Sequence, residues 1–481
     1  PRCKPYGHQL NQKYLACPHR ADLDRERYTV LDRGIQAEIE LFREDNIPLQ
    51  TESAKQSQTY QKLCGAMTVE WDGREHTLPQ MAKYLEETDR SRRQAAWERI
   101  SQRRLQDRDA MDAIFNSLVK LRHQMALNAD CANFVEYAFR MYHRFDYTPQ
   151  DCLQFHDAIE QCVMPVVHCI HARRRQTMNL ASLRPWDMAV DPLGRPPLRP
   201  FQEASEMVEK VGKILHHVDP ELANQFQEMN DNHELDLESR VGKAPGGYQY
   251  TLDEVRRPFI FMNAAGLQRD VETLLHESGH AFHALACQHD SLLPYRESPI
   301  EFAEVASMTM ELFGATFYEE FYDSQNAARA RRKIFEGILD VLPWIARVDA
   351  FQHWIYTHPD HTTEERTAQW LALENRFGSK LDWSGYPSIR ESIWQRQLHL
   401  FCHPFYYIEY GIAQLGALQL WRIFKRDPSQ AVKGYRSALT LGGSKPLPQL
   451  FAAAGIRFDF SIHTLEPLMD AVKDELESLP E

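Results

Sequence analysis

The chain has 481 residues, and its 68 acidic residues outnumber its 55 lysines and arginines to give a formal net charge of −13. This balance argues against a nucleic-acid or anionic-membrane partner, and no apolar run approaches the roughly 20 residues that span a bilayer. With 43% hydrophobic and 26% charged residues, the composition is that of a folded soluble protein, long enough for two lobes and a large core.

Residues 2–15 already have the pattern of the middle of a helix, so we expect the natural protein to continue before Pro1. The nine cysteines are scattered and include no Cys-x-x-Cys, which favours reduced thiols and a cytoplasmic location. Cys162, His168, Cys169 and His171 have zinc-finger residue types but the wrong spacing, and we interpret them as packing residues of a helix.

Residues 1–66 have a helical pattern with a break near Pro48, and the alternation at 68–78 around Asp72-Gly73 predicts a β-hairpin. Residues 89–126 form a long charged helical stretch, whose interleaved acids indicate a solvated face rather than a basic patch. Helical patterns continue to about Leu180. Five prolines at 184–200 predict a crossing loop or lobe boundary, and Asp219 caps the next helix.

A glycine-rich turn runs from Gly242 to Tyr248. It is not a phosphate loop, because its Gly-Lys pair lacks the following Ser or Thr and the preceding strand. Its position predicts a flexible loop over a cleft, with a purely structural turn as the alternative.

The most informative motif is His-Glu-x-x-His, from His276 to His280. On a helix, residues four apart share a face, so the two imidazoles suit one tetrahedral zinc ion. Glu277 between them can take a proton from water at the open coordination position. Apolar residues recur at helical spacing around the motif, and Asp270 stands at the expected N-cap.

The run from Pro258 to Met262 predicts a strand, and residues 263–266 predict the turn out of it. A strand beside the metal helix would let a peptide substrate pair its backbone with it.

A catalytic zinc site needs a third protein ligand. The metzincin pattern would place a third histidine six residues after His280, but Ala286 occupies that position. His283 is interpreted as a packing histidine or as one that supports a ligand. Downstream, Glu301, Glu304 and Glu311 lie in an apolar helical pattern, where acids are costly unless paired or bound to metal. Spacing alone does not choose between Glu301 and Glu304.

Residues 331–356 and 363–377 predict further helices, with His358 and His361 interpreted as capping and loop residues. In the aromatic stretch 399–411, Pro404 predicts a first helical turn, and Tyr407 and Tyr410 would share a face. Their phenols could donate to an oxyanion, or the helix could simply belong to the core.

The motif at 276–280, followed by Phe302-Ala303-Glu304-Val305-Ala306-Ser307, resembles the thimet-oligopeptidase family of zinc peptidases, especially its bacterial oligoendopeptidase F branch. The resemblance covers most of the chain after about residue 60. It implies that Glu304 is the third zinc ligand, that Glu311 orients a zinc histidine, and that Glu301 lies at the surface or rim.

The resemblance also implies roles for residues outside the motif. His399, Tyr407 and Tyr410 would hold the substrate carbonyl and the tetrahedral intermediate, with Tyr406 as a near competitor and a substrate contact. The segment containing Gly246, Gly247 and Tyr248 would lie near the substrate backbone.

Together these observations predict a mainly α, two-lobed peptidase with a small β-sheet beside the active-site helix, and the resemblance implies a zincin-like fold with a deep substrate channel. We expect an N-terminal helical segment with a hairpin at 1–88 and a catalytic region at 89–481, with zinc helices at about 270–315 and the Tyr-rich helix at about 399–425. The predicted activity is endopeptidase cleavage of short unfolded peptides with one zinc ion per chain, and no nucleic-acid or membrane partner. The alternatives are a zinc-stabilised scaffold and a hydrolase of non-peptide amides.

Overall fold

A computed structural model describes residues 3–240, 243 and 246–480. The chain divides into two compact units, of which unit 1 comprises Pro1–Arg25, Asp32–Pro197 and Leu342–Ile408, and unit 2 comprises Glu26–Leu31, Leu198–Val341 and Glu409–Glu481. The chain leaves unit 1 after Pro197, within the proline-rich stretch that predicted a lobe boundary. The predicted segment boundary at residues 88/89 falls inside unit 1, and the catalytic role of 89–481 stays a prediction.

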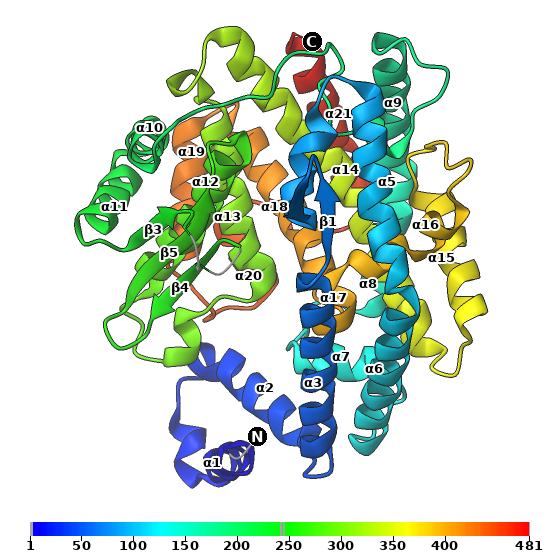
Figure 1. Cartoon of the computed structure of the whole chain (residues 1–481). Helices are drawn as coiled ribbons and strands as arrows, with labels where there is room; N and C mark the ends of the chain where they lie inside the picture. Colours follow the sequence, from blue (N-terminus) through cyan, green and yellow to red (C-terminus); the bar gives the residue numbers. More distant parts are fainter. Residues whose placement is uncertain (1–2, 241–242, 244–245, 481) are drawn as a thin grey trace. The chain divides into compact units, whose positions relative to one another are not determined.

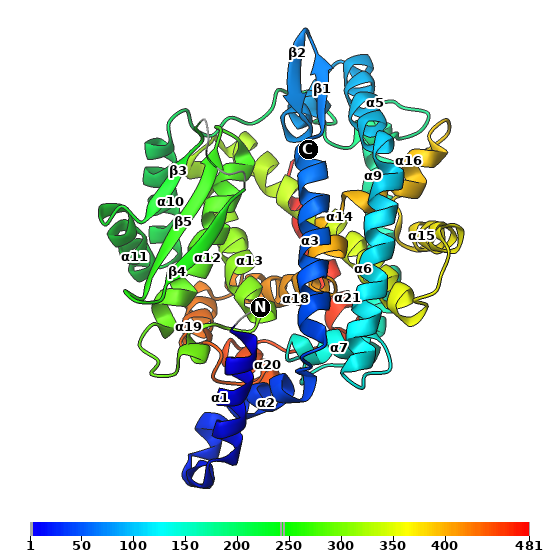
Figure 2. The ribbon, with the colours of Figure 1, turned by 60° about the horizontal axis from the view of Figure 1, so that its bottom comes forward.

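Unit 1 is a helical assembly with one hairpin (Figures 1 and 2). Its elements, of which α2 and α14 also contribute to unit 2, are α1 (Lys4–Ala16), η1 (Pro18–Asp22), α2 (Arg25–Leu41), α3 (Asn46–Gly65), β1 (Thr68–Trp71), β2 (Arg74–Thr77), α4 (Leu78–Met81), η2 (Ala82–Glu86), α5 (Arg90–Gln106), α6 (Arg108–Asn128), α7 (Phe134–Met141), α8 (Pro149–Ala158), η3 (Ile159–Val163), α9 (Met164–Thr177), η4 (Pro185–Asp187), α14 (Ser324–Thr357), α15 (Thr363–Phe377), α16 (Pro387–Ser392), η7 (Ile393–Arg396) and α17 (Leu398–Cys402).

The predicted hairpin is confirmed: β1 and β2 pair antiparallel, with Trp71 opposite Arg74. Asp72 and Gly73 have φ of 51° and 72°, the conformation that a two-residue hairpin turn requires. Below the hairpin α3 packs along α6 (Figure 2). Tyr60 of α3 stacks on Phe401 at 3.8 Å, so stacked aromatic rings form part of the core of this unit.

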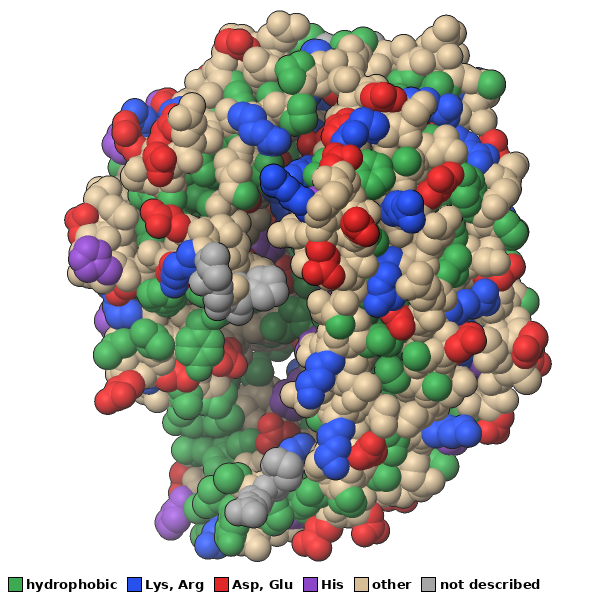
Figure 3. Space-filling model, in the orientation of Figure 1, with side chains coloured by type: hydrophobic (Ala, Val, Ile, Leu, Met, Phe, Trp, Pro, Cys, Tyr) green, Lys and Arg blue, Asp and Glu red, His purple; other side chains and the backbone are tan. Residues whose placement is uncertain are grey.

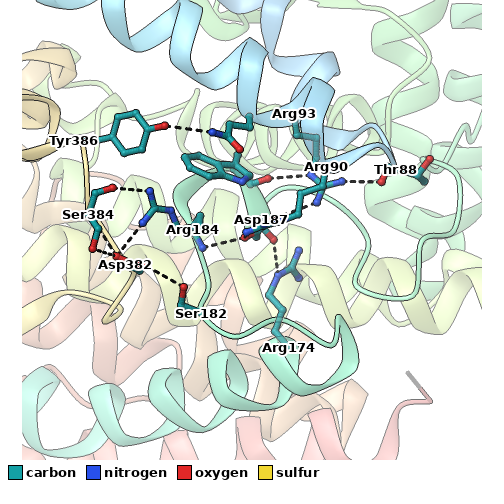
Figure 4. A network of polar contacts seen from close by, with 12 residues as sticks. Thr88, Arg90, Arg93, Arg174, Ser182, Arg184, Asp187, Asp382, Ser384 and Tyr386 are labelled. Carbon is teal, nitrogen blue, oxygen red and sulfur yellow. Dashed lines mark hydrogen bonds and ion pairs between the residues drawn. The ribbon is translucent and has the colours of Figure 1, made fainter.

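A buried polar network ties the η4 loop to α5 (Figure 4). Asp187 is fully buried and accepts two hydrogen bonds from Arg90, at 2.9 and 2.8 Å, and one from Arg93. Burial opposes ionisation of Asp187, but hydrogen bonds from Arg90 and from the Arg184 N–H lower its pKa. Arg184 also forms an ion pair with Asp382 at 2.9 Å. The network therefore fixes the loop that precedes the passage into unit 2.

The charged helical stretch predicted at 89–126 corresponds to two helices, α5 and α6. Its arginines face acids, as in the pair of Arg92 with Glu87 at 2.7 Å, and Figure 3 shows charges of both signs interspersed over this face. The predicted solvated face is wrong for Arg93, which is 2% exposed because Asp187 and backbone carbonyls surround its guanidinium.

Unit 2 combines a three-stranded sheet with packed helices (Figure 1). Its elements, in addition to the first part of α14, are α10 (Ala204–Val218), α11 (Pro220–Asp231), β3 (Leu235–Glu238), β4 (Tyr248–Leu252), β5 (Arg257–Ala264), α12 (Gln268–Cys287), η5 (Leu293–Arg296), α13 (Ile300–Ala315), η6 (Tyr318–Glu320), α18 (Ile408–Phe424, whose first residue belongs to unit 1), α19 (Pro428–Leu439), α20 (Leu447–Ala453) and α21 (Ile462–Ser478).

The sheet has the strand order β3-β5-β4, with β3 parallel and β4 antiparallel to β5. The strand predicted at 258–262 is confirmed as the central strand β5, in which Pro258, Ile260 and Met262 alternate as buried residues. This face lies against α12, so the small sheet lies beside the helix that carries the His-Glu-x-x-His motif. β4 is left as an edge strand.

Helices α12 and α13 pack closely together in the core of unit 2. Leu274 and Leu275 of α12 and Val305 of α13 have no exposed surface. Phe313 of α13 stacks on Phe424 of α18 at 4.2 Å. This packing brings Glu304 of α13 to 3.4 Å from His276 of α12.

The predicted fold class is confirmed, since helices dominate the chain and the sheets are small. The nine cysteines, all of them within the described residues, are thiols and form no disulfide. None of the helices in the described ranges combines the length and apolarity that crossing a bilayer requires.

Candidate metal centre

Helix α12 presents two imidazoles on one face. It begins at Gln268, two residues before the predicted cap, because Asp270 sits in the first turn and accepts from the N–H groups of Ala265 and Leu267 at 2.7 and 2.9 Å. One turn apart, the rings of His276 and His280 have centroids 4.9 Å apart.

Helix α13 supplies a carboxylate to this pair. Glu304 Oε2 lies 3.4 Å from Nε2 of His276 and 3.8 Å from Nε2 of His280. Ser307, one turn on, donates its hydroxyl to the same oxygen at 3.2 Å. One donor atom from each of His276, His280 and Glu304 lies within 4.8 Å of the others, so the two histidines of the motif and the acid implied by the family resemblance are together.

The orientation of His276 is set by a second carboxylate. Its Nδ1 lies 2.6 Å from Glu311 Oε1, which leaves Nε2 facing Glu304. Although burial opposes charging of this imidazole, hydrogen bonds to Glu304 and Glu311 raise the pKa of His276 well above its ordinary value. Burial lowers the pKa of His280 to about 4, so His280 is neutral at neutral pH and can act as a ligand.

Glu277 is 7% exposed. Burial raises its pKa to about 7, the charge of Glu304 adds to this effect, and a hydrogen bond from the backbone N–H of Gln249 opposes it. A carboxyl group with such a pKa can both accept and release a proton at neutral pH.

The donor set fits a zinc ion. Two imidazole nitrogens and one carboxylate oxygen are zinc ligands, and the distances from Glu304 are near the roughly 3.3 Å edge of a tetrahedron with zinc bond lengths. The side chains of His276 and His280 are 23% and 19% exposed, so the centre is open on one side. A catalytic site needs such an opening, whereas a structural site has four closed positions.

The close approach of α12 and α13 depends on a glycine whose role we did not predict. A Cβ on Gly279 would lie 2.6 Å from Ser307 Cα and 2.7 Å from the carbonyl oxygen of Ala306. Both are backbone atoms and cannot move without moving α13 and Glu304. Small residues at Gly279 and at Ala306-Ser307, beside each ligand, were the available signal in the sequence.

Replacing Gly279 by Ala should therefore force the two helices apart. We expect a loss of about 1–3 kcal/mol in the free energy of unfolding, which is typical of overpacking, together with weaker zinc binding. Urea unfolding and zinc titration of the purified variant measure both effects.

Gly337 is the matched control, because it lies in α14 of unit 2 and a Cβ added to it would meet no atom within 4 Å. Gly337→Ala should raise stability by about 0.4–1 kcal/mol, as alanine does in a helix, and leave zinc affinity unchanged. Equal zinc affinities in the Gly279 and Gly337 variants would contradict the role of the close contact.

A histidine and an acid near the centre, His283 and Glu301, are both buried. His283 is buried against Phe302, with ring centroids 6.1 Å apart, and burial lowers its pKa to about 3. The expectation that Glu301 lies at the surface or rim is wrong: it is 4% exposed, and its neighbour Phe302 is buried with it, although Ile300 before them is exposed.

The aromatic residues predicted for the oxyanion belong to different units. His399, Tyr406 and Tyr407 lie together in unit 1, with the ring of His399 4.9 Å from Tyr407 and 5.7 Å from Tyr406. Tyr410 is part of α18 in unit 2.

The predicted helical turn at Pro404 is wrong, and Tyr407 precedes α18 instead of sharing its face with Tyr410. The reason is Phe405, whose φ of 67° interrupts the helix. Its N–H donates to Gln352 Oε1 at 2.6 Å and its carbonyl accepts from Arg144, so tertiary contacts hold this conformation.

The glycine-rich turn is described only in part, since Gly242, Ala244 and Pro245 lie outside the described residues. Gly246 has a φ of 106°, and a Cβ on Gly247 would lie 3.1 Å from the Thr273 side chain of α12. Tyr248 begins β4 and is 49% exposed. The backbone of this segment thus passes close to the motif helix.

The chain is similar to several known peptidases. It is 24% identical over 329 residues to oligopeptidase PepF of Bacillus subtilis. This aligned stretch covers 66% of this chain and 47% of that protein. A 148-residue stretch is 27% identical to the chromosomal oligoendopeptidase F of Lactococcus lactis, covering 31% of this chain and 24% of that protein. The chain therefore spans about half the length, or less, of these curated relatives.

Solved structures show the same fold. PZ peptidase A with an inhibitor superposes with a TM-score of 0.93 and 28% identity, over 99% of this chain and 84% of that one. Oligoendopeptidase-F of Enterococcus faecium, at 16% identity and a TM-score of 0.63 over 98% of this chain and 88% of that one, shares the fold alone.

The sequence pattern of peptidase family M3 matches residues 83–469, which is most of the chain and includes the residues of the metal centre. This match confirms the predicted resemblance. The chain belongs to peptidase family M3.

Proposed function

We propose that the chain is a zinc-dependent metalloendopeptidase that hydrolyses internal peptide bonds of short unfolded peptides. The observation that carries the proposal is the convergence of His276, His280 and Glu304 beside Glu277, a buried carboxyl group with a pKa of about 7. A structural metal site has no use for such a base, so the arrangement favours hydrolysis over a scaffold role.

The three ligands would hold one zinc ion, which when bound polarises a water molecule and the scissile carbonyl. Glu277 takes the proton of the attacking water on its carboxylate and passes it to the nitrogen of the leaving amine. Glu311 accepts the Nδ1–H of His276 and so keeps Nε2 directed at the centre, where this nitrogen would give up its proton on binding the ion.

Edge strand β4 supports a peptide as substrate. Its outer backbone groups are not paired with β5, and an extended peptide can add to such an edge through main-chain hydrogen bonds. Tyr248, Tyr250 and Leu252 alternate along one face and are 49%, 60% and 45% exposed, which leaves them available to substrate side chains. We propose Gly246, Gly247 and Tyr248 as substrate contacts on this ground.

The remaining assignments rest on the family resemblance. We propose His399, Tyr407 and Tyr410 as donors to the oxyanion, with Tyr406 as a substrate contact, because neutral donors lower the barrier to tetrahedral intermediates. The nine thiols support a reducing compartment such as the cytoplasm.

Cleavage of a quenched-fluorescent peptide of about ten residues tests the proposal. We expect a chelator to abolish cleavage and stoichiometric zinc to restore it. A non-peptide amide of similar size should remain intact. Undiminished cleavage after the metal has been removed would rule out the mechanism, and turnover of the amide alone would point to a different hydrolase.

A further inference from the structure

Unit 1 contains a second group of metal-ligating side chains, separate from the centre on α12 and α13. Helix α8 supplies Cys152 and His156, and α14 supplies Asp349 and His353. Each pair is four residues apart and so shares one helix face. Donor atoms of Cys152, Asp349 and His353 all lie within 4.8 Å of one another. Metal sites in helix bundles are built in this way, from side chains on facing helices.

The carboxylate at the centre of this group is incompletely satisfied. Asp349 is 0% exposed, and its Oδ2 lies 2.9 Å from Nε2 of His156, which is 1% exposed. Its other oxygen, Oδ1, is buried with no hydrogen-bond partner among the described residues. A buried carboxylate is unfavourable unless it is fully paired or coordinates a cation. A cation bound to Oδ1 would remove this cost.

The nearby imidazole is also poorly satisfied. Nε2 of His353 lies 3.3 Å from Asp349 Oδ2 but lacks hydrogen-bond geometry, and no other described residue bonds to it. The side chain of Cys152 has no exposed surface. A thiolate, a carboxylate and a neutral imidazole around a divalent cation have no net charge, which makes burial of the whole group favourable.

A route into the group is present. His156 and His353 line a cavity of about 680 Å³ within unit 1. Leu153 and Phe145 also line it and are 44% and 37% exposed, so the cavity reaches the surface of the unit. An ion could enter through it after folding.

We propose that unit 1 binds a zinc-like divalent transition-metal ion through Cys152, Asp349 and His353, with His156 holding Asp349 in place. The sulfur and nitrogen donors favour Zn²⁺ or Co²⁺ over Mg²⁺ or Ca²⁺, which prefer oxygen. This second site depends only on residues of unit 1 and does not rest on the proposed peptidase activity.

Cobalt substitution tests the site without an activity assay. A thiolate gives bound Co²⁺ an intense near-ultraviolet charge-transfer band, and the centre on α12 and α13 contains no thiol. In the full chain carrying His280→Ala, which weakens the other centre, we expect the band at about one equivalent of Co²⁺. Adding Cys152→Ser or His353→Gln should remove the band. Adding Cys131→Ser, the matched buried cysteine of unit 1, should leave it.

Circular dichroism would reveal a variant that fails to fold. Even then, the presence or absence of the band in the His280→Ala chain, which retains Cys152, tests the second site. Absence of the band in His280→Ala, or its survival in a folded Cys152→Ser variant, would overturn the second site. If the wild-type chain cleaved no peptide, only the peptidase proposal would be contradicted. The two failures are therefore distinguishable.

Discussion

Replacing Glu277 by Gln should lower kcat/KM for peptide cleavage by about 10²–10⁴-fold, the usual contribution of a general base. The amide has nearly the same shape as the carboxyl group but cannot accept the proton of water. Since the three proposed metal ligands are untouched, zinc content should stay at the wild-type level. Single-turnover cleavage and metal analysis of the same preparation measure the two quantities.

Glu272 provides the matched control for this substitution. It lies on α12 five residues before Glu277 and accepts a hydrogen bond from Gln268 at 3.1 Å. Glu272→Gln removes a carboxyl group from the same helix and should leave kcat/KM within a few-fold of wild type. Normal turnover by the Glu277 variant would show that another group accepts the proton.

The parts of the structure that were predictable from sequence depend on local chemistry. The Asp72-Gly73 turn, the cap at Asp219 and the alternation along 258–262 each specify an element through residues close in sequence. The i, i+4 spacing of His276 and His280 likewise places two imidazoles on one face before any tertiary contact is known.

The parts that were not predictable depend on contacts between distant residues. Phe405 leaves the helical region because Gln352 and Arg144 hold its backbone groups, and neither partner is near it in sequence. The grouping of Cys152 with His353 needs the packing of α8 on α14. Two helical pairs, Cys-x-x-x-His and Asp-x-x-x-His, were present in the sequence, but nothing local indicated that they meet.

The choice between Glu301 and Glu304 illustrates the same limit and leads to the second large effect. Both acids are buried on α13, at 4% and 7% exposure, and spacing along the helix does not distinguish them. In the structure it is Glu304 whose oxygen lies 3.4 Å from His276 and 3.8 Å from His280. A carboxylate in this position would neutralise part of the charge of a bound cation, whereas an amide would not.

Removing a residue that only orients a metal ligand weakens metal binding by up to about 100-fold. Glu304→Gln alters a proposed ligand itself and should therefore weaken zinc binding by more than about 100-fold. Cleavage should be lost with the metal and should return only at high added zinc. Glu301→Gln, an identical change one turn earlier on the same buried helix, should keep zinc affinity within a few-fold of wild type. Competition with a chromogenic chelator gives both affinities. If the Glu301 variant loses zinc and the Glu304 variant keeps it, then the third ligand is Glu301, and the assignment of Glu304 to the metal centre is wrong.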